Sequence, residues 1–161
     1  MPISVSHAAG SLKKFRRVAG QFDHQATFTT PPKNLPPFIA ALFSAIGPIE
    51  SGVVIISKII FEPKNLDALL ARYSLASLDD AQNTTDLTVL SAGENETQEL
   101  LQAALADPVD FAFVPSPKVV HIYADHDDYV TFFTARKGNL SRIIEAFSAI
   151  GIMPNDYHRK L

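Results

Sequence analysis

The 161-residue sequence contains no cysteine. The chain therefore has no disulfide framework, no thiol nucleophile and no thiolate ligand for a metal ion. Its seven glycines are scattered and form neither a dinucleotide-binding GxGxxG motif nor a phosphate-binding P-loop. The nucleophile motif GxSxG and the zinc motif HExxH are also missing. These absences remove the common signatures of nucleotide-binding and hydrolytic enzymes, so we expect no cofactor.

Long apolar runs are missing as well. The longest candidate, VVIISKIIF, is interrupted by Ser57 and Lys58 and is much shorter than the roughly 18 residues of a membrane helix. The N-terminal segment MPISVSHAAG lacks the charged start and the apolar block of a secretory signal. We therefore expect a soluble cytoplasmic protein that does not insert into a membrane. No feature of the sequence indicates an oligomeric state.

The composition indicates a folded chain, because 47% of the residues are hydrophobic and 19% are charged. Its net charge of −3 is unevenly distributed. The first 30 residues carry four basic side chains against Asp23 alone, a local balance of +3, so the remainder carries −6. An acidic body repels phosphate. Nucleic acid is therefore an unlikely partner. Contact of nucleic acid with the basic residues Lys13, Lys14, Arg16 and Arg17 remains only a weak alternative.

A proline-rich segment, TTPPKNLPP, follows the basic residues. Prolines at this density predict a stiff, extended connection. We therefore divide the chain into an N-terminal basic arm or added layer, residues 1–30, and a single α+β domain, residues 31–161. Within the arm, SLKKFRRVAG has the spacing of a short helix that packs Leu12, Phe15 and Val18 and leaves its charges in water.

Apolar periodicity predicts the elements of the larger domain. Residues spaced by three or four indicate helices over 38–47, 65–75, 94–108 and 139–151, with Asn65, Asn95 and Asn139 at their N-terminal ends in capping positions. Runs rich in β-branched and aromatic residues indicate strands over 51–62, 86–91, 110–115, 118–124 and 129–135. The fold predicted from these elements is α+β, with a mostly antiparallel sheet of about five strands and helices packed largely on one side. The final segment, PNDYHRKL, is polar, and we expect it to fray unless a partner binds it.

The stretch VVHIYADHDDYVTFF, residues 119–133, predicts an aromatic hairpin with an acidic connection. Pairing the strands about the centre of the connection places Ala124 opposite Tyr129 and Ile122 opposite Thr131. Val119, His121, Tyr123, Val130 and Phe132 then share the other face. Aspartate is favoured in turns because its side chain bonds nearby backbone N–H groups.

The same residues permit a second interpretation, a metal-dependent hydrolase. Histidines with carboxylates suit zinc, manganese or iron. This hypothesis centres on Asp125, His126, Asp127 and Asp128, with His121 as a base or a supporting residue. The glycine and the distant glutamate of a calcium-binding EF-hand loop are missing. In regular strand geometry His121 and His126 point to opposite faces, so the metal hypothesis requires a strongly bent loop.

The leading hypothesis is a non-enzymatic binding or interaction protein. An acidic body with an aromatic, acidic hairpin suits a basic protein partner, as an inhibitor or immunity-type protein would. We expect the binding residues to be those of the hairpin and its connection: His121, Tyr123, Asp125, His126, Asp127, Asp128 and Tyr129.

Overall fold

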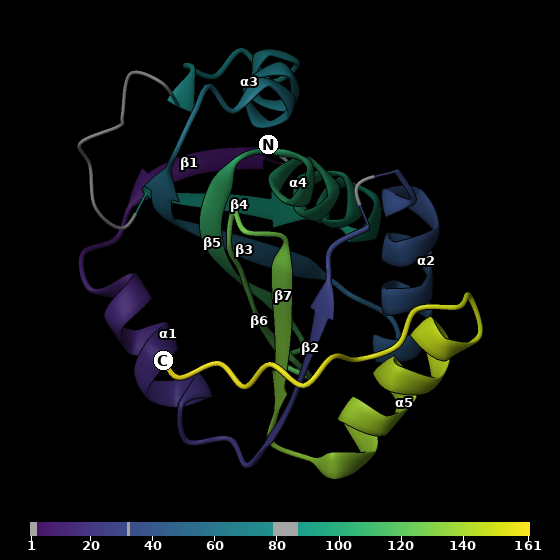
Figure 1. Ribbon diagram of the computed structural model, residues 1–161. Helices are drawn as coiled ribbons and strands as arrows, with labels where there is room; N and C mark the ends of the chain where they lie inside the picture. Colours follow the sequence, from purple (N-terminus) through teal and green to yellow (C-terminus); the bar gives the residue numbers. More distant parts are fainter. Residues whose placement is uncertain (1–2, 32, 79–86) are drawn as a thin grey trace.

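The computed structural model describes residues 3–31, 33–78 and 87–161, and these form one antiparallel sheet with helices on both faces (Figure 1). The seven strands of the described residues are β1 (Ile3–His7), β2 (His24–Thr29), β3 (Ser51–Ile59), β4 (Leu87–Ala92), β5 (Val109–Ser116), β6 (His121–Ala124) and β7 (Tyr129–Thr134). Their five helices are α1 (Ser11–Ala19), α2 (Leu35–Ile46), α3 (Lys64–Ala71), α4 (Glu94–Ala106) and α5 (Lys137–Ser148). The strand order is β1-β4-β3-β5-β6-β7-β2.

The α+β class and the antiparallel sheet are confirmed, but the expected number of strands was too low. The two additional strands, β1 and β2, both come from the first 30 residues and form the two edges of the sheet. Each is short and pairs with one other strand, β1 with β4 and β2 with β7; on its outer side, β2 forms a single bridge from Thr27 to Asn155. Their sequences, ISVSH and HQATFT, are largely polar, and a half-exposed edge strand needs few apolar residues.

The two faces of the sheet carry separate apolar clusters. Helices α2, α3, α4 and α5 cover one face and share the main core with it, which confirms that the helices pack largely on one side. Of the described helices, only α1 packs on the other face, at the lower left of Figure 1. There the buried side chains are Phe15, Ala19, Ile55, Ala112, Tyr123 and Phe133.

Strand β3 is central, as its sequence predicts. It pairs with β4 on one side and β5 on the other. Val54 and Ile56 are buried in the main core, whereas Ile55 is buried beneath α1. A strand buried on both faces requires a continuous apolar run rather than an alternating one.

The predicted asparagine caps are wrong. Asn65, Asn95 and Asn139 each lie inside a helix, and the residue at the N-cap position of each of these three helices makes no side-chain capping bond. Helix α3 is instead capped from a distance by Asp107, which precedes β5. One carboxylate oxygen of this buried side chain accepts the backbone N–H of Asn65 at 3.0 Å, and the other accepts that of Leu66 at 2.7 Å. The side chain of Asp107 therefore joins α3 to the end of α4.

We predict that Asp107→Ala lowers the free energy of unfolding by about 2 kcal/mol, because two helix N–H groups lose their acceptor. Urea denaturation measures the loss. Asn65→Ala, which removes only the side-chain bond to the same carboxylate, is the milder comparison. Equal stability of Asp107→Ala and the wild type would contradict the capping role.

Candidate functional site

The candidate site is the turn between β6 and β7, and its register differs from the prediction by one residue. Tyr123 pairs with Thr131 and Ala124 with Val130. The Asp125 N–H also donates to the Tyr129 carbonyl at 3.0 Å, so only three residues, 126–128, form the connection. The prediction assumed four. An odd connection shifts the pairing by one residue and reverses which side chains of the second strand share a face with those of the first.

The shape of the turn depends on two aspartates. The backbone of Asp128 is left-handed, with φ of 68°, a conformation that aspartate tolerates better than most residues. The Asp125 Oδ1 atom accepts the N–H of Asp127 at 3.0 Å and that of Tyr129 at 3.2 Å. These bonds close the turn, so Asp125 performs the structural role expected of a turn aspartate.

The corrected register places His121 and Tyr123 on the α1 face, together with Thr131 and Phe133. The predicted face, which combined His121 and Tyr123 with Val130 and Phe132, is therefore wrong. Ile122, Ala124, Val130 and Phe132 instead face the main core. Tyr123 is buried, and its hydroxyl lies 3.0 Å from the Ser57 hydroxyl. Of the two tyrosines predicted to bind a partner, only Tyr129 is partly exposed.

The tail, residues 152–161, crosses the α1 face of the sheet in front of β2 and β7 (Figure 1). The buried Arg159 guanidinium donates through Nη2 to Asp125 Oδ2 at 2.9 Å and through Nε to Thr131 Oγ1 at 3.0 Å. Its Cζ lies 4.9 Å from the centre of the Tyr123 ring. Asp125 therefore serves the turn with one oxygen and the tail with the other.

Three further contacts hold the tail, so the expectation that it frays is wrong. The Asn155 N–H donates to the Thr27 carbonyl at 2.8 Å. The Tyr157 ring stacks on that of Tyr129, with 5.0 Å between centres. The Gln25 amide bonds both the N–H and the carbonyl of Arg159, at 2.9 and 3.2 Å. Asn155, Tyr157 and Arg159 are two residues apart, and this spacing was the available sequence signal for an extended segment lying on a sheet.

His126 turns away from the turn and toward β5. Its backbone N–H and its Nδ1 both lie 2.8 Å from Asp110 Oδ1, and its Nε2 lies 3.6 Å from Asp127 Oδ1. The hydrogen bond to Asp110 raises the pKa of His126 above 6.5, with further help from the charges of Asp110, Asp127 and Asp125. Sequence reasoning missed Asp110, because nothing in DFAFVP distinguishes it from an ordinary residue at a strand end.

His121 is separated from this group and buried beneath α1. Its ring lies 5.6 Å from that of Phe15 and 5.0 Å from that of Phe22, between centres. The Nδ1 atom is buried without a hydrogen-bond partner among the described residues. Burial, together with the charge of Lys118, lowers the pKa of His121 to about 4. His121 is therefore a packed strand histidine that lies apart from the group around His126.

The side chains of the acidic turn therefore diverge. Asp125 points toward Arg159 and His126 toward Asp110, while the Asp127 side chain is 73% exposed. Within residues 3–31, 33–78 and 87–161, no group of three or more His, Asp or Glu side chains could hold a metal ion. The hydrolase hypothesis requires a ligand set that the described residues of this turn do not form.

A pocket of about 270 Å³ lies beside the turn, between it and the segment that joins α4 to β5. Leu35, Val109 and Phe111 contribute apolar surface to the pocket. Three carboxylates also line it, those of Asp107, Asp125 and Asp128, and His126 completes the polar side. The turn thus adjoins a concave surface of mixed polar and apolar character that carries negative charge.

No protein-family model matches this chain, and neither a curated protein nor a solved structure matches it. In the part of the chain that the structure describes, no helix is both long enough and apolar enough to cross a membrane. Functional conclusions therefore rest on the chemistry of the chain itself.

We predict that Arg159→Met lowers the free energy of unfolding by about 3 kcal/mol, because it leaves the largely buried Asp125 carboxylate without its partner. Urea denaturation measures the loss, and limited proteolysis should show faster cleavage of the tail. Lys160→Met, which alters the exposed neighbouring residue, is the matched control and should retain wild-type stability. A double-mutant cycle with Asp125→Asn measures the interaction energy between Asp125 and Arg159. A coupling energy near zero would contradict a stabilising ion pair.

We predict that His121 makes the protein less stable as pH falls from about 6.5 to about 4. In this window the unfolded chain binds a proton that the buried, neutral ring does not, so the free energy of unfolding falls by up to about 3 kcal/mol from this residue. Urea denaturation across pH should show a shallower dependence for His121→Leu. His7→Gln, at an exposed histidine, should keep the wild-type slope; an unchanged slope in His121→Leu would refute the assignment.

Proposed function

We propose that this protein is a non-enzymatic, cytoplasmic binding module, and that its β6–β7 turn docks a basic segment of a protein partner. The observation that carries the proposal is the turn itself, in which a rigid acidic loop lies beside a partly apolar pocket. An inhibitor or immunity-type protein would use such a surface against a basic target.

The carboxylates of this surface differ in their availability. Asp125 and Asp107 are committed to Arg159 and to α3, respectively. Asp127 contacts only the distal nitrogen of His126, and the Asp128 carboxylate has no hydrogen bond or ion pair with any described residue. The negative charge free to meet a cation therefore lies on Asp127 and Asp128, which we define with His126 as the hairpin tip.

The tip is preorganised for binding. Its backbone is fixed by the bonds to Asp125 and by the Thr30 N–H, which donates to the Asp128 carbonyl at 2.7 Å. A rigid loop loses little conformational entropy when a partner binds. The adjacent pocket suits the aliphatic part of an arginine or lysine side chain, whose charged end could then reach the carboxylates at the rim.

His126 makes the charge of the tip depend on pH. When its ring is protonated, it offsets one of the neighbouring carboxylates. Because its pKa is raised, this offset persists to a higher pH than for an ordinary histidine. Affinity for a basic partner should therefore increase as pH rises through that pKa.

The test uses a synthetic peptide in which arginine alternates with leucine, titrated into isotope-labelled protein and followed by NMR. We predict that backbone shifts concentrate at residues 126–128 and around the pocket, and that Asp127→Asn with Asp128→Asn weakens binding about tenfold. Two carboxylates are lost without changing the size of either side chain.

The matched control is Glu50→Gln with Glu145→Gln, which removes the same charge from exposed residues outside the tip and the pocket. This control should retain wild-type affinity. Equal weakening in both double variants would indicate a general charge effect, and shifts confined to another surface would refute the proposed docking site.

A further inference from the structure

A second cleft lies between α1 and the tail, near the open end of the β6–β7 hairpin and away from the tip. Its volume is about 400 Å³. The C-terminal end of α1 forms one wall, the tail forms the opposite wall, and β2 and β7 supply the floor between them. The side chains that matter here are Phe22, Gln25, Phe133, His158, Lys160 and Leu161.

The wall formed by the tail is fixed in place. Both polar groups of the Gln25 amide are engaged with the backbone of Arg159, and the Arg159 side chain is anchored on Asp125 and Thr131. The His158 Nε2 atom lies 3.3 Å from the amide nitrogen of Gln25. The cleft therefore exists before any ligand binds.

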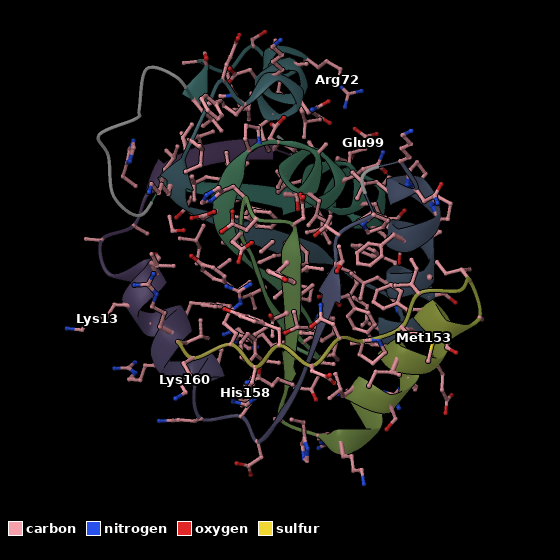
Figure 2. All side chains as sticks on the ribbon, in the orientation of Figure 1. Lys13, Arg72, Glu99, Met153, His158 and Lys160 are labelled. Atoms are coloured by element: carbon pink, nitrogen blue, oxygen red, sulfur yellow. The ribbon has the colours of Figure 1, made fainter. Side chains whose placement is uncertain are left out.

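Both walls of the cleft carry basic residues. Lys160 lines the cleft itself. Helix α1, whose C-terminal end lines the cleft, exposes four cations on the side opposite its buried residues: Lys13, Lys14, Arg16 and Arg17. None of them forms an ion pair with a described residue. Figure 2 shows Lys13, His158 and Lys160 on the same side of the molecule as α1. Asp23 is the one acidic side chain of the cleft lining in the described residues.

The interior of the cleft is partly apolar. Phe133 and Ala19 are buried at its base, while Phe22 is half-buried and Leu161 is 38% exposed. A ligand that reaches the interior can therefore cover apolar surface, and its charges can meet the cations at the rim. Such a ligand carries negative charge on both sides of an apolar group.

We infer that this cleft docks an acidic peptide segment of a partner protein, with one apolar side chain of the segment inserted between α1 and the tail. Charge complementarity selects this occupant. The apolar face of α1 is already packed on the sheet, so α1 presents only its charged side to the partner. The surface is separate from the hairpin tip and has the opposite charge.

A short acidic peptide fits this surface better than a nucleic acid does. The chain as a whole carries a net charge of −3, so a long polyanion that extends beyond the basic residues of α1 and the tail gains no net attraction from the rest of the molecule. A peptide of a few residues stays within the basic region. Its apolar side chain also accounts for the interior of the cleft, which phosphate contacts alone would leave unused.

The test titrates a synthetic peptide in which glutamate alternates with leucine into the full chain, followed by NMR and calorimetry. We predict shifts at the cleft residues and about tenfold weaker binding in the double variant Arg17→Glu with Lys160→Glu. Leu161→Ser should weaken binding less, because it removes only part of the apolar contact. The control Lys33→Glu with Lys137→Glu makes the same charge change at exposed sites outside the cleft and should bind as the wild type does.

Other outcomes would overturn the inference. A polyglutamate peptide that binds as tightly as the alternating one would exclude a role for the apolar interior. Tighter binding of a single-stranded oligonucleotide, or of anionic phospholipid vesicles, at the same residues would assign the surface to another partner. The basic peptide used to test the hairpin tip should not perturb the cleft. Failure of the proposal for one surface is therefore distinguishable from failure of the proposal for the other.

Discussion

The structure around the hairpin depends on one ion pair, between Asp125 and Arg159. Two buried or largely buried charges are costly to remove from water, and such a pair is tolerated only when the remaining polar groups are bonded as well. Here Thr131 accepts from the guanidinium, and the other oxygen of Asp125 accepts two backbone N–H groups of the turn. The shape of the turn and the path of the tail are consequently set by the same carboxylate, although 34 residues separate the two partners.

The sequence predicts the centre of this fold better than its edges. Strand β3 is recognisable because both of its faces are buried, which requires a continuous apolar run. The outer strands β1 and β2 bury apolar side chains at only three positions, Ile3, Ala26 and Phe28, so the apolar pattern that marks a strand is faint. The tail is harder still, because it is held by side-chain bonds to Gln25 and Asp125. Its one sequence signal is the two-residue spacing of Asn155, Tyr157 and Arg159, which three polar or partly polar side chains make faint.

The sequence likewise predicts some features of the candidate site and not others. That Asp125 is a turn residue follows from local chemistry, since aspartate bonds the N–H groups just after it. The directions of the neighbouring side chains cannot be predicted in this way. One residue more or less in the connection changes which face of the sheet each side chain of the second strand points to. The three-residue turn became evident only from the paired strands, and with it the burial of His121 under α1. Four residues able to bind a metal ion are adjacent in the sequence. In the structure, however, Asp125 points toward Arg159, His126 toward Asp110, and Asp127 mainly into solvent.

The two proposed surfaces are linked through the tail. Arg159 lines the basic cleft, yet its guanidinium is bonded to the residue that precedes the acidic tip. A ligand in the cleft that displaced the tail would withdraw Arg159 from Asp125 and free that carboxylate beside the tip. A ligand that left the tail in place would preserve the neutral pair and the rigid turn. Because Gln25 and Tyr129 also hold the tail, a ligand that fits the existing cleft leaves the tip unchanged.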